Sequence, residues 1–352
     1  MSRSRIVTGY RPTGKLHLGH WFGNLQNMLA LQESHDAYYF VADLHALTSE
    51  WQNSGKIAQY TEEMVLDWCA AGLDPDKCTI YRQSDIPEVC ELDLYFNMVL
   101  PMTWLERTPS YKEQKAQISE KDLGNVGFFL YPSLMAADIA IMQADCVPVG
   151  EDQLPHLELT REIVRRFNRC YGNFLIEPQA LIAKEGARVP GSDGRKMSKS
   201  YGNSIYISDT PEDITKTIMG FMTDPARKLK TDPGNPDVCP LHQIHKLIAP
   251  ESEIAQWETD CREATCGCVA HKKVIAKELV EYLADFQARR AELSKDPHFA
   301  REVLEAGALK ARPIAQNTVA MARELIGLDS RSALTKDVVI DAEGDASAPS
   351  FV

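Results

Sequence analysis

Two histidines near the start of the chain have the spacing of a nucleotide-binding site. His17 and His20 stand three residues apart, with Gly19 between them, directly after a turn at Pro12–Gly14. At the start of a helix, both imidazoles can face one ligand, and the unpaired N–H groups and positive dipole end of the helix favour phosphate. Gly19 would let a nucleotide approach the backbone closely. The alternative is a helix cap with incidental histidines, because such short strings also occur by chance.

Two lysines lie in a second segment, Gly194–Asn203, which is rich in glycine, serine and basic residues. Lys196 and Lys199, three residues apart on a flexible loop, can close over a triphosphate and neutralise the charge that develops on pyrophosphate. A solvated basic loop is the alternative. The two segments occur in a fixed order about 180 residues apart, and the pair is far more specific than either segment alone. Together they predict an ATP site.

Alternating strands and helices must hold these segments in place. The expected strands are Arg5–Gly9, Ala37–Ala42, Thr79–Tyr81 and Asp145–Val149, and the expected helices are His17–Gln32, Ile57–Ala71 and Leu157–Asn168. This alternation predicts an α/β fold with a Rossmann-like, doubly wound parallel sheet. After Asp209 strand signals fade and helices dominate. We therefore predict a catalytic domain at 1–208, a helical domain at 209–328 and a loosely ordered tail at 329–352.

Composition restricts the classes of function. No apolar run approaches the 18 residues or so that a membrane-spanning helix needs, so we expect no membrane partner. The first residues carry no signal-peptide core, and we expect a cytoplasmic protein. The formal charge of −12 argues against a protein that coats nucleic acid. It leaves room for one structured RNA partner, because a local basic face can lie on an acidic body.

The two segments resemble the signatures of a known family. His17–His20 resembles the "HIGH" motif of class I aminoacyl-tRNA synthetases, and Lys196–Ser200 has the letters of their KMSKS motif. Three further stretches are similar to the bacterial tryptophanyl-tRNA synthetases: Tyr131–Ile139, Val147–Gln153 and His156–Arg161. The likeness covers most of the chain up to Leu328. It implies the class I core with a helical anticodon-binding domain, activation of L-tryptophan with ATP and Mg²⁺, and transfer to tRNA(Trp). It also implies a homodimer formed through Asn97–Glu113.

The resemblance assigns roles around ATP. The substrate carboxylate is already ionised when it attacks the α-phosphate, so catalysis is chiefly positioning and charge stabilisation. By resemblance, His17 and His20 lie near the phosphates, and Lys196 and Lys199 clamp the leaving pyrophosphate. The implied ATP-binding residues are Arg11, Thr13, Gly19, His20, Gly150, Asp152, Lys196, Met197, Ser198 and Lys199. Arg11 departs from the glutamine of many members, and we expect it to change substrate contacts without loss of activity.

Amino-acid selection is expected to depend on Asp138. The indole N–H is a donor without acceptor capacity, so a buried carboxylate suits it, and phenylalanine would leave that carboxylate unpaired. Tyrosine also donates a proton, so pocket shape must reject it. The implied tryptophan-binding residues are Val7, Gly9, His45, Tyr131, Met135, Asp138, Val147 and Gln153. Tyr131 and Gln153 are expected at the amino and carboxylate ends of the substrate. The alternative for Asp138 is a surface acid.

A cysteine group lies in the helical region. Cys239, Cys261, Cys268 and His271 follow one another after gaps of 21, six and two residues, and Cys266 is a further candidate. Residues 11–14 have the sequence Arg-Pro-Thr-Gly, which resembles a subgroup of the family that includes enzymes with a [4Fe–4S] cluster on four cysteines at nearly this spacing. In this chain the first gap is one residue shorter, and histidine stands at the fourth position. Four thiolates suit such a cluster, and three with one imidazole also suit zinc. A reduced cysteine patch is the third possibility. The scattered cysteines, Cys69, Cys78, Cys90, Cys146 and Cys170, are expected in the core.

Three other functions compete with tryptophan activation. A tyrosine-specific relative shares the fold and both ATP motifs. A nucleotidyltransferase with one His-x-Gly-His site is disfavoured by the second lysine motif and the helical region. A non-catalytic paralogue that only binds tRNA is disfavoured by the intact histidines and lysines. In the helical region Lys272, Lys273 and Lys277 form either a phosphate-contacting stretch or a solvated helix face.

Overall fold

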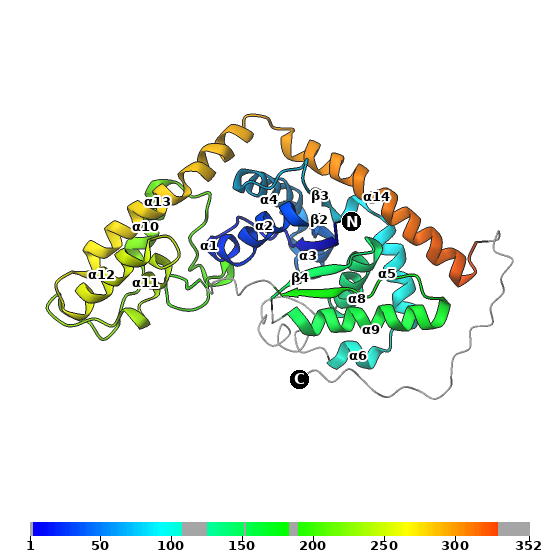
Figure 1. Cartoon of the computed structure of the whole chain (residues 1–352), viewed down its shortest axis with the longest axis horizontal. Coiled ribbons are helices and arrows are strands. Elements are labelled where there is room, and N and C mark those ends of the chain that lie inside the picture. Colours follow the sequence, from blue (N-terminus) through cyan, green and yellow to red (C-terminus); the bar gives the residue numbers. More distant parts are fainter. Residues whose placement is uncertain (1–2, 108–124, 151–152, 183–188, 330–352) are drawn as a thin grey trace.

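A five-stranded parallel sheet forms the centre of the molecule. The computed structural model describes residues 3–107, 125–150, 153–182 and 189–329. The strands are β1 (Arg5–Tyr10), β2 (Asp36–Val41), β3 (Thr79–Arg82), β4 (Cys146–Val149) and β5 (Gln179–Ile182), in the order β3-β2-β1-β4-β5 (Figure 1). The strand order reverses between β1 and β4, and in such sheets ligands bind beyond the carboxyl ends of the strands at this point. The predicted doubly wound fold is confirmed.

Each strand contributes side chains to two separate cores. In β1, Ile6 belongs to one hydrophobic cluster and its neighbour Val7 to the other. In β2, Tyr39 faces the first cluster while Tyr38 and Phe40 face the second. Successive residues of a strand point to opposite faces, so apolar residues at every position indicate a sheet that is covered on both sides.

Helices cover the two faces. The first face carries α1 (Leu18–His20), α2 (Gln26–Ser34) and α4 (Ile57–Ala71), and the second carries α5 (Glu88–Val99), α8 (Val126–Ile141) and α9 (Leu154–Tyr171). Two further helices, α3 (Asp43–Glu50) and α6 (Met102–Arg107), contact α8. Short 3-10 turns occupy Trp51–Lys56, Gln83–Asp85, Lys199–Tyr201 and Pro236–Val238. The helix predicted at 57–71 is confirmed and ends at Gly72, whose φ of 115° suits glycine.

The helix predicted over 17–32 differs from the expectation. A π-helical turn, Trp21–Leu25, interrupts it and separates α1 from α2. Within this turn Trp21, Phe22 and Leu25 are all buried, and all three belong to the first hydrophobic cluster. Single π turns inside helices are frequent at functional sites.

The helical region consists of α10 (Pro211–Gly220), α11 (Pro240–His245), α12 (Glu251–Arg262) and α13 (Cys268–Leu293), which lie together at one end of the molecule (Figure 1). None of the described helices is long and apolar enough to cross a membrane. Because α13 reaches from this region to α4, the two parts of the molecule are joined along one long helix.

The last helix, α14 (Phe299–Ile326), returns to the sheet and runs along its β3 edge. A Cβ on Gly307 would lie 1.7 Å from the carbonyl oxygen of Ile80, so only glycine allows this approach. Further along, Thr318 donates a hydrogen bond to Ile141 O at 2.9 Å. The predicted boundary at 209 stays a prediction, but residues 299–326 pack on the sheet rather than with α10–α12.

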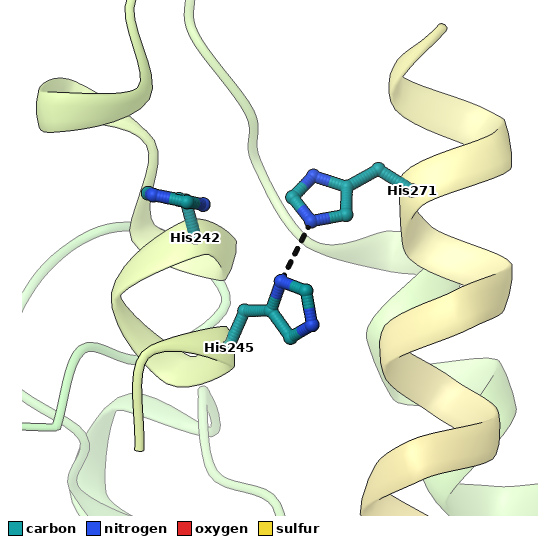
Figure 2. A group of neighbouring side chains, drawn as sticks. All are labelled: His242, His245 and His271. Atoms are coloured by element: carbon teal, nitrogen blue, oxygen red, sulfur yellow. Dashed lines mark hydrogen bonds between the residues drawn. The ribbon is translucent and has the colours of Figure 1, made fainter. Parts of the chain in front are cut away.

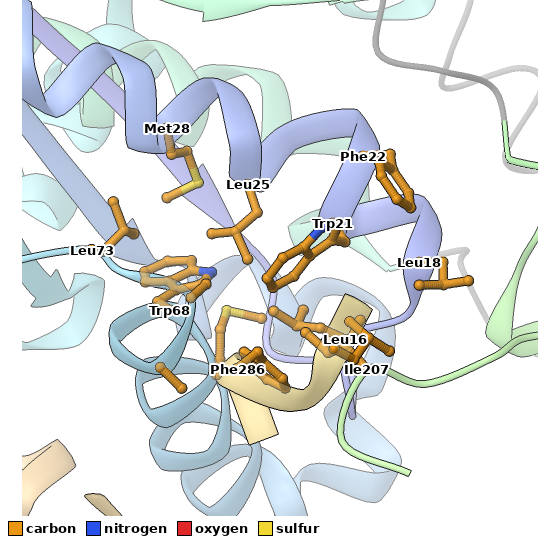
Figure 3. Packing of buried hydrophobic residues seen from close by; sticks show 14 of the residues in the cluster. Leu16, Leu18, Trp21, Phe22, Leu25, Met28, Trp68, Leu73, Ile207 and Phe286 are labelled. Carbon is orange, nitrogen blue, oxygen red and sulfur yellow. The ribbon is translucent and has the colours of Figure 1, made fainter. Parts of the chain in front are cut away.

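An aromatic cluster fastens α13 to the segment that carries His17 and His20. Trp21 packs edge-to-face on Phe286, with ring centroids 5.4 Å apart, and its Nε1 donates a hydrogen bond to Tyr282 Oη at 3.1 Å. Figure 3 shows this junction, where side chains of the π turn, α4 and α13 converge with Leu16 and Ile207. The Trp21–Tyr282 hydrogen bond therefore connects α13 to the turn that directly follows His20.

Candidate active site

His17 and His20 cap the helix that they open. His17 Nδ1 accepts a hydrogen bond from the backbone N–H of Gly19, and His20 Nδ1 accepts one from the backbone N–H of His17, each at 3.1 Å. The two rings lie 3.8 Å apart between centroids. The two histidines therefore do cap the helix, but the cap uses only the Nδ1 atom of each ring. Neither Nε2 has a hydrogen-bond partner within the part of the chain that the structure describes.

Both imidazoles are neutral near pH 7. Burial lowers the pKa of His17 to about 4, with the charges of Lys199 and Lys196 adding to the effect. Burial, His17 and Lys199 lower the pKa of His20 to about 2. A neutral imidazole that accepts at Nδ1 carries its proton on Nε2. Each ring can therefore donate one Nε2–H hydrogen bond to an anionic oxygen, while the positive charge must come from lysine.

Lys199 supplies that charge at the histidine turn. Its Nζ donates a hydrogen bond to the carbonyl oxygen of Gly14 at 2.8 Å. Burial lowers the pKa of Lys199 to about 8, opposed by Asp67 and assisted by Arg11. The ammonium form still predominates at pH 7. The structure thus brings one predicted lysine to the predicted histidine segment.

Backbone hydrogen bonds join the two segments. Leu18 N donates to Ile205 O at 3.0 Å, and Ile207 N donates to Leu16 O at 3.1 Å. Met197 is buried, with its Cβ 3.9 Å from the position that a Cβ on Gly19 would take. Met197 thus anchors the lysine segment in the core beside Gly19, whereas the Lys196 side chain is exposed.

Asn203 holds the lysine segment in an ordered turn. Its Oδ1 accepts from Ser198 N at 2.8 Å, and its Nδ2 donates to Asp193 Oδ1 at 2.7 Å. Arg195 lies over the Tyr201 ring, 4.1 Å from the centroid. The segment was expected to be a mobile loop, yet in this conformation its side chains hold it in a hydrogen-bonded turn. Sequence reasoning missed Asn203 and Asp193, because a glycine- and serine-rich composition gives no sign of such pairing.

A large open cavity of about 800 Å³ lies beside the lysine segment. Its lining includes Thr13, Gly14 and Lys199 together with Lys15 and Lys216, but neither histidine. Asp209 and Asp213 also line it. Three lysines around one cavity next to a helix start make the region suited to a polyanionic ligand.

Asp138 lies in a buried hydrogen-bond network. On α8 and only 2% exposed, its carboxylate accepts from His45 Nε2 at 2.8 Å and from Gln83 Nε2 at 2.8 and 2.9 Å. Burial raises the pKa of Asp138, and the hydrogen bonds from His45 and Gln83 act against that rise. The surface-acid alternative is wrong, because the residue is buried. The expectation that phenylalanine would leave this carboxylate unpaired is also wrong, because His45 and Gln83 pair with it.

Gln83 is the residue that sequence reasoning missed in this network. Fully buried, it directs Nε2 at Asp138, while its Oε1 accepts from the backbone N–H groups of Leu44 and His45 at 3.1 and 3.2 Å. These bonds fix the amide orientation. The available signal was its position: Gln83 follows β3 directly, at the carboxyl edge of the sheet where ligands bind.

The other expected tryptophan-site residues are spread around the same edge. Val7 and Val147, on the strands β1 and β4, are buried. A Cβ on Gly9 would lie 2.2 Å from the Phe40 ring, so a larger residue would force that ring to move. Tyr131 Oη hydrogen bonds to His156 Nε2 at 3.0 Å.

The remaining predicted residues are less enclosed. Met135 is half-buried on α8, Thr13 is half-buried, and Arg11, Gly150 and Gln153 are exposed. Gln153 N donates to Gly150 O at 3.0 Å. Asp152 lies outside the described residues.

The cysteine group converges on one small cavity. Cys239, Cys261, Cys266, Cys268 and His271 all line it. Among the residues described, however, no cysteine belongs to a set of three donor atoms within 4.8 Å of one another. Donors at 2.0–2.3 Å from one zinc ion lie at most about 4.6 Å apart, so zinc on the predicted set does not fit this arrangement.

The contacts and exposure of four basic residues modify the predictions for the helical region. Arg227 Nη1 lies 3.9 Å from the sulfurs of both Cys261 and Cys268, so a guanidinium shares the cysteine cavity. Lys272 Nζ donates to the carbonyl oxygens of Met219 and Phe221 at 2.9 and 2.7 Å, which ties it to the end of α10. Lys273 and Lys277 are exposed.

Of the scattered cysteines, Cys90 is exposed, contrary to the expectation of core packing.

Comparison with known proteins gives one consistent result. Residues 1–284 match the family described as tRNA synthetases class I (W and Y). The tryptophan–tRNA ligase of Thermotoga maritima is 44% identical over 326 residues, covering 92% of this chain and 99% of that protein. The tryptophanyl-tRNA synthetase of Campylobacter jejuni, solved with ADP and tryptophan, is 35% identical, with a TM-score of 0.84 over 92% of this chain and 99% of that one. The tyrosyl-tRNA synthetase of Archaeoglobus fulgidus, 22% identical with a TM-score of 0.60, shares the fold.

Proposed function

The chain belongs to the class I tRNA synthetases of the tryptophan and tyrosine group, and we propose that the residues described above catalyse the reaction of a tryptophan–tRNA ligase. The chain is a tryptophan–tRNA ligase: it activates L-tryptophan with ATP and transfers it to tRNA. Relatives with this activity match nearly its whole length at 35–44% identity. The tyrosine-specific alternative is disfavoured, because the tyrosyl enzymes compared are 18–22% identical and share only the fold.

The hydrogen bond from Lys199 to Gly14 O carries the mechanistic proposal. It puts an ammonium at the turn where the capping histidines leave Nε2–H free. We propose that the triphosphate of ATP lies between these groups. The tryptophan carboxylate attacks the α-phosphorus, a new P–O bond forms, and the bond to pyrophosphate breaks with its electrons on the leaving oxygen. Lys199 and Lys196 neutralise that charge, and Mg²⁺ would share it.

The neutral state of the histidines supports their assigned role. An Nε2–H donor orients a phosphate oxygen without adding a charge that would hold pyrophosphate in place after the reaction. No residue is needed as a general base, since the attacking carboxylate is already ionised. His17 and His20 therefore position ATP, and the lysines stabilise the developing charge.

Tryptophan selection is proposed to involve Asp138 together with its two partners. An ionised carboxylate has about four acceptor positions, so Asp138 can accept an indole N–H in addition to the bonds from His45 and Gln83. Phenylalanine would leave one acceptor position unused rather than a whole charge unpaired, so the penalty is smaller than the sequence suggested. Tyrosine is proposed to be rejected by the shape of the pocket around Val7, Met135 and Val147.

A homodimer is proposed through α5 and α6. Leu94, Met98 and Met102 are 51%, 70% and 67% exposed, which is unusual for large apolar side chains that cluster in sequence. They lie in or next to the predicted segment Asn97–Glu113, of which residues 108–113 fall outside the described part. Light scattering on the purified protein tests this. We also propose a cytoplasmic location, on the basis of membership in the tRNA synthetase family.

An iron–sulfur cluster is proposed on the cysteine cavity, with Cys266 as the fourth thiolate in place of His271. The donor set fits such a group, since four thiols line one cavity and the Arg227 guanidinium is placed to offset the charge of thiolates. Anaerobic purification with iron and sulfide analysis tests it. Iron-free protein that retains full activity and stability would end this proposal.

The function is tested by ATP–pyrophosphate exchange with each of the twenty amino acids. Exchange that depends on tryptophan alone is the expected result. Exchange with tyrosine would identify a tyrosine-specific relative, and no exchange with any amino acid would identify a non-catalytic paralogue.

A further inference from the structure

We propose that His242, His245 and His271 form a binding site for a divalent metal ion of the zinc class that uses no cysteine ligand. His242 and His271 also line the cysteine cavity, so the proposed site adjoins that cavity. One ring nitrogen of each residue lies within 4.8 Å of those of the other two. Figure 2 shows the three rings gathered between α11, which carries His242 and His245, and α13, which carries His271. All three are buried, with exposed fractions of 1%, 0% and 8%.

Carboxylates fix the orientation of two of the rings. His242 Nε2 pairs with Glu258 Oε1 at 3.0 Å, and His245 Nε2 pairs with Glu278 Oε2 at 2.8 Å. A neutral imidazole that donates from Nε2 offers the lone pair of Nδ1. Metal-ligating histidines almost always donate their second nitrogen to a carboxylate or carbonyl in this manner. The arrangement is therefore the outer shell that a zinc site requires.

His242 Nδ1 offers an unpaired lone pair at this site. This nitrogen is buried and has no hydrogen-bond partner among the residues described. Buried polar atoms are nearly always paired, so an unpaired one in a native core needs an explanation such as an ion. The ring nitrogens of His245 and His271 lie near it without forming a hydrogen bond to it. Three such nitrogens together can ligate one metal ion.

His245 and His271 are spaced for a shared ion. His245 Nδ1 and His271 Nε2 lie 3.0 Å apart, which requires His271 Nε2–H to donate to His245 in the metal-free protein. Two nitrogens at 2.0–2.1 Å from one tetrahedral zinc ion lie roughly 3.3 Å apart. A small shift therefore converts the hydrogen bond into two metal bonds. The His271 proton moves from Nε2 to Nδ1, so the imidazole stays neutral and no charge is left unbalanced.

The chemistry of the donors selects the class of metal. Imidazole suits zinc, copper and nickel, whereas magnesium and calcium prefer oxygen ligands. Three imidazoles fill three positions of a tetrahedral zinc site, and solvent fills the fourth. The site would join α11 to α13, with α12 attached through Glu258 and through Trp257, which stacks on His271 at 4.3 Å. Its expected role is structural, holding the helical region together.

The test uses the full chain, stripped with a chelator and titrated with Zn²⁺ by calorimetry and by thermal unfolding. We expect one zinc per chain and a higher unfolding temperature. His242→Gln should weaken binding at least tenfold while keeping a polar side chain at the position. Glu278→Gln, which removes an outer-shell carboxylate, should weaken binding about 10–100-fold. His298→Gln is the matched control, because His298 is exposed on the surface, and it should bind zinc normally.

The double variant Cys261→Ser/Cys268→Ser separates this site from the cysteine cavity. Under the proposal it still binds one zinc. If zinc binding is lost in the cysteine variant and kept in His242→Gln, the proposal is overturned in favour of the cavity. Should His242→Gln not fold, the cobalt-substituted wild-type protein decides: a thiolate-to-cobalt absorption band, or no stoichiometric cobalt at all, also overturns the histidine site. ATP–pyrophosphate exchange is measured separately, so a failure of the proposed enzymatic activity can be distinguished from a failure of zinc binding.

Discussion

The ammonium of Lys199 donates a hydrogen bond to the carbonyl oxygen of Gly14, 185 residues earlier in the chain, over 2.8 Å. This contact closes the lysine segment onto the turn before His17. The hydrogen bond also fixes the position of the Lys199 ammonium beside this turn. The predictions that concern ATP depend on this contact.

Lys199→Ala should slow adenylate formation by about 10²- to 10³-fold, the loss typical of a donor that stabilises developing charge. Tryptophan affinity should change little, because the Asp138 network shares no residue with Lys199. Pyrophosphate exchange and tryptophan titration measure the two effects. Lys273→Ala, an exposed lysine on α13, is the control and should leave both unchanged. Equal losses of exchange and tryptophan affinity would contradict the role given to Lys199.

The pH dependence of activation should follow Lys199. Burial lowers its pKa to about 8, so the free enzyme loses this positive charge as the pH rises through that value. We expect kcat/KM for ATP to decline above about pH 8. Lys199→Arg keeps a charge throughout the range, so its residual activity should lack that decline. A decline of the same shape in both proteins would assign the ionisation to another group.

Gln83→Leu should impair tryptophan use more than ATP use. The substitution removes Nε2, which donates to both oxygens of the buried Asp138 carboxylate. It also removes Oε1, which accepts from the backbone N–H groups of Leu44 and His45. Hydrogen bonds to charged groups contribute about 1.5–3 kcal/mol, or roughly a 10- to 150-fold change. The expected loss is in kcat/KM for tryptophan, with KM for ATP nearly constant. Gln52→Leu, on an exposed turn, tests whether the substitution itself has a general effect.

The fold was predictable from sequence to the extent that local patterns decide it. The continuous apolar run Ala37–Ala42 predicted the strand found at Asp36–Val41, and the helix at 57–71 ends at a glycine, so both followed from their own residues. The Asp138 network could not be read in the same way. Its partners lie 93 and 55 residues away. The position of Gln83 directly after β3 suggests a place at the ligand-binding edge, but it does not show that the side chain is fully buried or that it pairs with Asp138. Only the sheet order brings these positions together.

Helix α14 illustrates a second limit of the sequence. Its apolar pattern predicts a helix, but the surface that it covers depends on the path of the chain in space. The sequence placed residues 299–326 with the helical region, whereas they lie along β3. The signal was Gly307 in a helix interior, where glycine is unfavourable unless close packing requires it. The need for glycine becomes clear only when the position of the Ile80 carbonyl is known.

Gly307→Ala should destabilise the protein, because its Cβ would lie 1.7 Å from the Ile80 carbonyl oxygen and β3 or α14 would have to move. Overpacking of this kind typically costs 1–3 kcal/mol, so a clear fall in unfolding temperature is expected. Gly23→Ala, where a Cβ meets no atom within 4 Å, is the matched control and should be neutral or slightly stabilising. Similar unfolding temperatures for the two variants would argue against the close packing of α14 on β3.

Tyr282→Phe tests whether α13 positions the ATP-binding turn. The Tyr282 hydroxyl accepts from Trp21 Nε1 at 3.1 Å and from Gln26 Nε2 at 3.2 Å, so its loss removes both bonds at once. Each contributes about 0.5–1.5 kcal/mol, and the π turn that they hold follows His20 directly. We therefore expect KM for ATP to rise several-fold together with a modest loss of stability. Tyr171→Phe, whose hydroxyl has no hydrogen bond in the described part of the chain, should lack both effects. A loss of stability in Tyr282→Phe without any change in KM for ATP would mean that the aromatic junction holds the two regions together but does not position His17 and His20.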